Sequence, residues 1–144
     1  MLVLLAVCLT TSCAPAAEDP APPHDTPPTA AAPIRYGEQA CDACVMVIGA
    51  PAYAAQAMTA DGRVLSFDDP GCLVLEVVMG RLEPARSRFR HADEDRWLAL
   101  DEVAFVRREG TPMDFGYAAV DRAEGELTFE QVRAEMDARF GPGR

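Results

Sequence analysis

The chain has 144 residues and a mass of 15.5 kDa, enough for one ordinary domain or two very small ones. Its formal net charge of −10 at pH 7 argues against binding nucleic acid or anionic lipid headgroups through charge. We therefore exclude nucleic-acid binding and look to individual motifs for the chemistry of the chain.

The chain begins with a segment typical of an export signal. Residues 1–9 are apolar throughout, and small residues then lead to Cys13. The apolar run is too short to span a bilayer. The pattern resembles a bacterial lipoprotein signal, so residues 1–12 are interpreted as a signal peptide and Cys13 as the lipidated first residue of the mature chain. This predicts a lipid-anchored protein on the periplasmic side of a cell membrane; an ordinary cleaved secretory signal is the alternative.

The next segment has the composition of a linker. Residues 14–33 consist almost entirely of Ala, Pro, Thr and acidic residues, which cannot bury enough apolar surface to fold. We therefore predict a flexible tether over residues 13–35, the lipidated cysteine included. A single folded domain is predicted over residues 36–144.

The folded part is predicted to contain two similar runs of elements. In the first, strands are followed by a helix capped by Asp69 and by one more strand, over the ranges 45–49, 52–59, 63–67, 70–80 and 87–92. In the second, Thr128 and Gln131 form a capping box at the start of the helix, and the ranges are 103–106, 116–120 and 128–140. The predicted fold class is α+β, with two small β-β-α units, at about 41–93 and 94–141, packed as a pseudo-repeat.

Three sulfur atoms lie close together in the stretch CDACVM. Side chains at i and i+2 of a strand share a face. If residues 45–49 form a strand that begins at Cys44, then Cys44 and Met46 project side by side and Cys41 folds back over them. Thiolate and thioether are soft ligands that favour Cu(I), whereas Zn(II) sites seldom use methionine. The stretch therefore predicts a Cu(I) site.

A second candidate ligand is Met113, which follows Pro112 in the stretch EGTPMDFGYAAV. This stretch reads as a loop between two strands, where a methionine has little core to fill. A thioether held at a loop tip can serve as a soft ligand; packing of a partly buried methionine under the loop is the alternative.

The other candidates receive structural interpretations. Cys72 lies in the first turn of its predicted helix, a position that favours thiolate, but free cysteine is commonly buried, so it is interpreted as a packed thiol. Asp68 and Asp69 are interpreted as turn and cap groups. His91 is interpreted as a solvated residue of a charged loop.

Several motifs occur together in a specific order: a lipoprotein signal, then CDACVMVI, DGRVLSFDDPGC, WLALDEVAFV and TPMDFGYAAV. In this order they resemble the NosL family, the accessory lipoproteins of nitrous oxide reductase maturation, over residues 39–120. The resemblance implies a chaperone that holds one Cu(I) and passes it, through a membrane-associated maturation complex, toward the reductase's copper–sulfide centre. It also implies a fold of two related small α+β units.

By position, the resemblance assigns the Cu(I) ligands to Cys44, Met46 and Met113, with Cys41 as an auxiliary ligand. Two residues differ from the family's pattern: Val45 stands where glycine is expected, and Asp114 stands where a small residue is usual. A β-branched Val45 stiffens a strand, which predicts a more extended site. Asp114 adds a hard oxygen beside a soft site.

We therefore expect a carrier and not an enzyme, since the sequence holds no Ser/His/Asp set, phosphate-binding glycine loop or His-rich zinc motif. The expected partner is a copper-accepting maturation complex or the reductase, and a homodimer that completes the site is left open. One alternative is an exported thiol-disulfide oxidoreductase that uses Cys41 and Cys44 and ignores the methionines. Another is a binding module with a structural disulfide and no metal.

Overall fold

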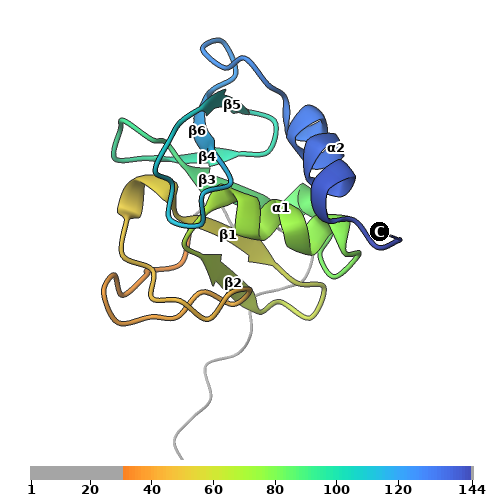
Figure 1. The fold of residues 1–144 in the computed structure, drawn as a ribbon. Helices are drawn as coiled ribbons and strands as arrows, with labels where there is room; N and C mark the ends of the chain where they lie inside the picture. Colours follow the sequence, from red (N-terminus) through yellow and green to blue (C-terminus); the bar gives the residue numbers. More distant parts are fainter. Residues whose placement is uncertain (1–30, 144) are drawn as a thin grey trace, which may run out of the picture.

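A computed structural model describes residues 31–143 of the chain. The predicted signal peptide, Cys13 and most of the predicted tether lie outside the described residues. Within them the fold is mixed α+β, with two antiparallel sheets and two α-helices (Figure 1). The predicted fold class is confirmed. Neither of the two helices in this range has the length and apolar character needed to cross a membrane.

The larger sheet has four strands in the order β2-β1-β3-β4, all antiparallel to their neighbours. Its strands are β1 (Ala55–Met58), β2 (Val64–Phe67), β3 (Ser87–Arg90) and β4 (Trp97–Ala99). The predicted turn at Asp61-Gly62 joins β1 to β2, with Gly62 at a φ of 87°. β4 begins where the second unit was predicted to start, yet it pairs with β3 and therefore belongs to the first sheet.

The smaller sheet consists of β5 (Val103–Arg107) and β6 (Tyr117–Asp121), and it is followed by the second helix. Helix α1 (Pro70–Val78) begins after Asp69, whose side chain accepts a hydrogen bond of 2.8 Å from the Gly71 N–H. Helix α2 (Phe129–Phe140) begins after Thr128, and both hydrogen bonds of the predicted capping box are present. Both helix starts are thus where the sequence predicts them.

The predicted strand at residues 45–49 is wrong. Val45 has a φ of 59°, in the left-handed region, and the only pairing in this stretch is an isolated bridge between Ala40 and Val47. The chain instead forms a tight loop, in which the Val45 N–H donates to the Cys41 carbonyl at 3.0 Å and the Cys41 N–H donates to the Met46 carbonyl at 2.7 Å. The expectation that Cys44 and Met46 share one face of a strand, in an extended site, is therefore overturned.

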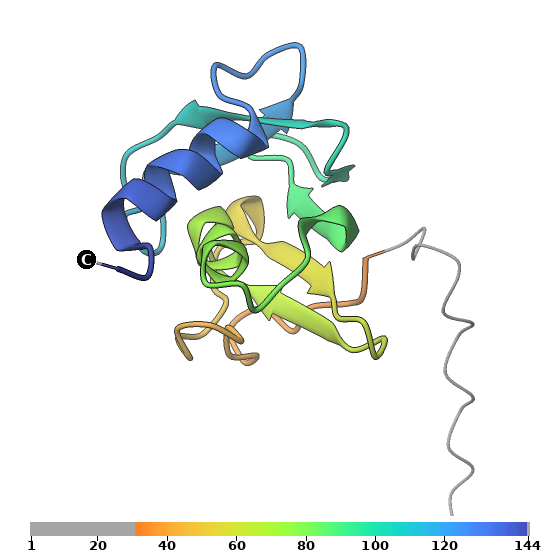
Figure 2. The same ribbon diagram turned by 90° about the vertical axis from the view of Figure 1, so that its right-hand side faces the viewer.

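One core joins the two units. The Ala92 N–H donates to the Ala119 carbonyl at 2.8 Å and so ties the chain after β3 to β6. Phe89 and Phe105, one from each sheet, meet edge to face with ring centroids 5.2 Å apart. The two helices pack against each other (Figure 2), and α1 covers β1 and β2 while α2 covers β5.

The described chain begins against the larger sheet. Ala32, inside the predicted tether, exchanges two hydrogen bonds with the buried Gln56 side chain, one of 2.9 Å to its oxygen and one of 3.0 Å from its nitrogen. Because Gln56 lies in β1, residue 32 is held against the sheet. The folded region therefore includes residues before Tyr36.

Candidate metal centre

Four side chains meet beside the first turn of α1. They are Cys41, Cys44, Asp68 and Cys72, and their potential ligand atoms all lie within 4.8 Å of one another. Two come from the loop before β1, one from the end of β2 and one from α1. All three cysteines of the described part of the chain are free thiols. This group can hold a metal ion.

The loop that carries Cys41 and Cys44, residues 41–46, is fixed to the outer edge of the larger sheet. The Asp42 N–H donates to the Ser66 carbonyl at 2.9 Å, and the Ser66 N–H donates to the Asp42 carboxylate at 2.7 Å. Ser66 lies in β2, which is an edge strand. An edge strand offers unpaired backbone groups, and here Asp42 uses them to hold the loop. We call residues 41–46 the cysteine loop.

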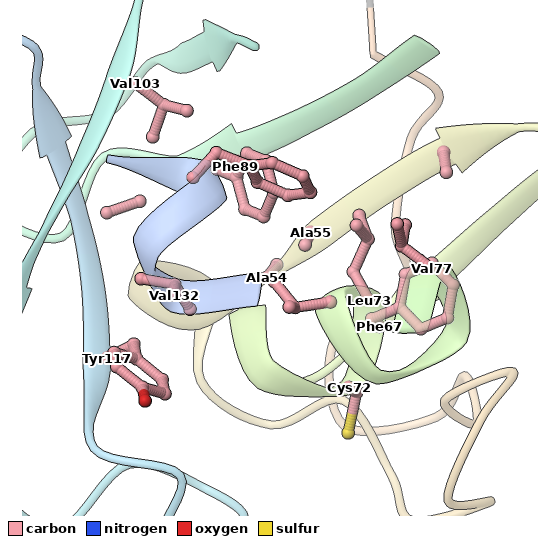
Figure 3. Packing of buried hydrophobic residues seen from close by; sticks show 14 of the residues in the cluster. Ala54, Ala55, Phe67, Cys72, Leu73, Val77, Phe89, Val103, Tyr117 and Val132 are labelled. Carbon is pink, nitrogen blue, oxygen red and sulfur yellow. The ribbon is translucent and has the colours of Figure 1, made fainter. Parts of the chain in front are cut away.

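Asp68 is the oxygen ligand of the group and a hydrogen-bond acceptor for two of its thiols. Its side chain is 2% exposed, and the same oxygen, Oδ1, lies 3.4 Å from the Cys44 sulfur and 3.5 Å from the Cys72 sulfur. Cys72 is the third residue of α1, and its sulfur points away from the labelled core side chains Leu73 and Val77 (Figure 3). The cluster therefore lies at the margin of the hydrophobic core, to which Cys41 and Cys72 both belong.

Hydrogen bonds favour a negative charge on Cys41. They hold the pKa of Cys41 at about 6, below the ordinary value of 9.0, and the largest cause is a hydrogen bond from the Cys72 thiol. Burial opposes this shift, while the backbone N–H groups of Cys44, Asp68 and Ala43 add to it. These hydrogen bonds therefore favour the thiolate form of Cys41 over the neutral thiol.

The other two thiols stay protonated beside that charge. Burial raises the pKa of Cys44 to about 11, and the negative charges of Cys41 and Asp68 act in the same direction. The pKa of Cys72 is raised further, first because its proton is shared with Cys41 and then because it is buried. Cys72 has one S–H, so it donates to Cys41 or to Asp68 at any moment and not to both.

The two predicted methionine ligands lie on the two loops that flank this cluster. Met46 is in the cysteine loop, with 54% of its surface exposed. Met113 is half-buried in the loop between β5 and β6, and its N–H donates at 3.0 Å to Asp69, the neighbour of Asp68. The ring of Phe115 fixes the same loop against α1, since a Cβ on Gly71 would lie 2.3 Å from it. Met113 is thus carried to the N-terminal end of α1, whereas Met46 lies on the exposed side of the cysteine loop.

Sequence reasoning missed Cys72 and Asp68 as members of the site. It interpreted Cys72 as a packed thiol and Asp68 as a turn group, and their burial agrees with both readings. The usable signal was their spacing, because a residue just before a helix and one four positions later lie on the same side of its first turn. The prediction of Cys41 and Cys44 as neighbours is confirmed, although through a loop and not a strand.

The donor set decides what the cluster can do chemically. The three sulfurs satisfy the preferences of Cu(I), and the three sulfurs together with the carboxylate oxygen of Asp68 also suit Zn(II). Cys44 is only half-buried, so the group opens to solvent on the side of the cysteine loop.

No protein-family model, curated protein sequence or solved structure matches the chain. The capacity of the cluster to bind a metal therefore rests on the residues and distances described above.

Proposed function

We propose that this protein is a Cu(I) carrier at the periplasmic side of the membrane, and that it delivers copper for nitrous oxide reductase maturation. The observation that carries the proposal is the meeting of three free thiols, Cys41, Cys44 and Cys72, within 4.8 Å of one another. The NosL-like motifs of the sequence supply the compartment and the acceptor. The carboxylate of Asp68 is the one hard ligand in the group.

The protonation of the thiols suits a carrier. The lowered pKa of Cys41 favours its thiolate form, which is the form that binds a soft ion. Cys44 and Cys72 are neutral and must each lose a proton when they bind, which makes their bonds to the ion easier to reverse at neutral pH. Such a site can hold Cu(I) and still surrender it to an incoming ligand.

Transfer requires an exposed side, and the cysteine loop supplies one. Cys44 is half-buried and Met46 is exposed, so a sulfur or imidazole of the acceptor can reach an ion bound there. Met46 and Met113 are proposed as the thioether ligands that bind the ion on this exposed side before its transfer. Lipid attachment through Cys13 would raise the effective concentration of the carrier at a membrane-bound acceptor.

The backbone beside each methionine supports this role. Val45 precedes Met46 and Asp114 follows Met113, and these are the two residues of the described chain, glycine apart, with positive φ, at 59° and 53°. A β-branched residue in the left-handed region is strained, and such strain concentrates at functional sites. These are also the two positions at which the sequence differs from the family's pattern.

A competition titration tests the proposal. Protein prepared without oxygen is titrated with Cu(I) in the presence of a chromogenic Cu(I) chelator, and one tight site is expected. Cys44→Ser and Met46→Ala should each weaken binding at least tenfold, the low end of what changes around a bound metal cost. Met79→Ala is the matched control, since Met79 lies at the opposite end of α1. Unchanged affinity in both site variants would reject the assignment.

A thiol-disulfide oxidoreductase is the second candidate, favoured by the lowered pKa of Cys41. It predicts a disulfide between Cys41 and Cys44 with a measurable reduction potential, unaffected by Met46→Ala or Met113→Ala. Against it, Cys41 is buried, so its thiolate cannot meet a partner's disulfide unless the loop opens. Mass spectrometry of the protein as isolated tests the carrier against its alternatives. Bound copper supports the carrier, whereas a loss of two protons without metal supports the oxidoreductase or a binding module with a structural disulfide.

A further inference from the structure

A second group of metal-binding side chains lies where the two sheets meet. His91 directly follows β3, Asp121 is the last residue of β6, and Glu124 is in the turn that follows β6. The His91 Nε2 atom lies 3.7 Å from a Glu124 oxygen and 3.9 Å from an Asp121 oxygen. These separations are too long for hydrogen bonds. The three side chains face one another without being bonded.

The histidine is the unusual member of this group. The sequence suggested a solvated His91, but its side chain is 3% exposed, and among the described residues its Nε2 atom has no hydrogen-bond partner. Its other nitrogen, Nδ1, accepts a hydrogen bond of 3.2 Å from the Asp93 N–H. Buried polar atoms without partners are rare and call for an explanation. Here the unpaired nitrogen is aimed between two carboxylates.

We propose that His91, Asp121 and Glu124 form a second metal site, which takes a borderline divalent cation such as Zn²⁺. One imidazole with two carboxylates is a donor set of this class, and the two negative charges balance the ion. Ligand atoms around one Zn²⁺ lie about 3 to 3.5 Å apart, so the His91 Nε2 atom would approach each carboxylate by about half an ångström when the ion binds. With no sulfur among its ligands, the site selects against Cu(I).

Two existing interactions must adjust when the cation binds. Coordination through Nε2 moves the ring proton to Nδ1, so the Asp93 N–H must exchange its hydrogen bond for one to water. Asp93 belongs to an exposed turn, where this change can occur. Arg96 donates to Asp121, but a carboxylate can accept from arginine and bind a metal at the same time. Because Arg96 partly neutralises Asp121, the affinity is expected to be moderate.

Binding at this site has a consequence for the whole fold. His91 follows a strand of the larger sheet, and both carboxylates belong to the end of the smaller one. A bound cation would add a link between the two units close to the hydrogen bond from Ala92 to Ala119. This inference does not depend on the copper proposal, because the two groups share no residue.

Histidine ring signals in nitrogen-15 NMR test the inference directly. The chain contains only two histidines, His24 and His91, and His24→Ala assigns them. Addition of Zn²⁺ to the full chain should move the His91 ring signals. Glu124→Gln, at a side chain 63% exposed, should need at least tenfold more Zn²⁺ for the same change. Glu126→Gln, an exposed acid two residues away and outside the group, should match the wild type.

Two results would overturn the site. In the first, the ring signals of His91 stay in place while Zn²⁺ binds elsewhere, which would mean that thiols or carboxylates alone hold the ion. In the second, Glu124→Gln and the wild type respond at the same concentration of Zn²⁺. Zinc bound by the three cysteines does not confuse either readout, because the ring of His91 itself is observed.

Discussion

The two helices begin with the same local device in opposite surroundings. Asp69 caps α1 and Thr128 caps α2, and the third helical residue is Cys72 in the first case and Gln131 in the second. Asp69 and Cys72 are buried, whereas Thr128 and Gln131 are exposed. At α2 the cap does nothing beyond starting a helix. At α1 the third helical residue, Cys72, belongs to a cluster of three thiols and one carboxylate, and the cap Asp69 is the chain neighbour of that carboxylate.

Burial accounts for the difference. A helix N-terminus presents N–H groups and a positive dipole end, which water screens at α2. At α1 the cysteine loop and the loop between β5 and β6 exclude water, so thiolate and carboxylate interact with fixed donors instead. The comparison teaches that a cap becomes a candidate site only when other segments cover it.

The largest difference is expected in stability. Asp69→Ala removes the cap of Gly71 and also leaves the Met113 N–H without its acceptor, and together these cost about 3 kcal/mol. Thr128→Ala removes an exposed cap only and should cost about 1 kcal/mol. Urea unfolding followed by circular dichroism measures both. Equal losses would show that burial adds nothing at α1.

The second prediction concerns Asp42, which holds the cysteine loop over the start of α1. Asp42→Ala removes the carboxylate that accepts the Ser66 N–H, so the cysteine loop should leave the edge of β2 more readily. Cu(I) affinity is then expected to fall about tenfold, as it does when groups that orient metal ligands are removed. Glu126→Ala in the second unit is the control. A Cu(I) titration in which Asp42→Ala matches this control would show that the loop needs no anchor.

A smaller gain is expected from Val45→Gly. The left-handed conformation costs a β-branched residue about 1 to 2 kcal/mol, and glycine gives back part of this through its greater freedom when unfolded. Val45 is 80% exposed, so little packing is lost, and the variant should be more stable by about 0.5 to 1 kcal/mol. Val47→Gly, at an ordinary φ, should lose stability instead. Thermal unfolding of the two variants is the measurement. If both variants lose stability, the backbone at Val45 is not strained.

The smallest effect concerns the thiol protons. Thiolate absorbance of the metal-free protein should rise near pH 6, and Cys72→Ala should move this step upward, because the Cys72 hydrogen bond is the largest cause of the low pKa of Cys41. A pKa below its unfolded value means that Cys41 contributes stability fully above pH 9, and that this contribution is lost as the pH falls through about 6. Gln131→Ala should leave the step unchanged. A first step near pH 9 in the wild type would contradict the hydrogen-bonded thiolate.

Much of the fold could be predicted because its signals are local. Asp69 and Thr128 predict the starts of the two helices, and Asp61-Gly62 predicts the first hairpin. The structure contains all three elements. The prediction of a strand at residues 45–49 failed because apolar β-branched residues also occur in a loop that Asp42 ties to Ser66, 24 residues later in the chain. The periodicity of apolar residues indicates which segments favour an extended backbone, but it does not indicate which other segment they pair with.

The candidate site was only partly predictable for the same reason. Cys41 and Cys44 are three positions apart in the sequence, so their meeting could be predicted. Cys72 and Asp68 join them only because the cysteine loop folds onto the edge of β2, and no local pattern encodes that contact. The exposure of His91 was wrongly predicted for a similar reason. Its charged sequence neighbours suggest an exposed loop, but its side chain is buried beside Asp121 of β6.

The ring of Phe115 has a practical consequence for anyone who handles this protein. It fills the space left by Gly71 at the start of α1, and it meets Phe140, the last residue of α2, edge to face at 5.7 Å. An affinity tag or fluorescent fusion placed after Phe140 would therefore begin next to the ring that seats the Met113 loop. Reporters for copper transfer are better placed at an internal turn, and the 61–62 hairpin turn offers one.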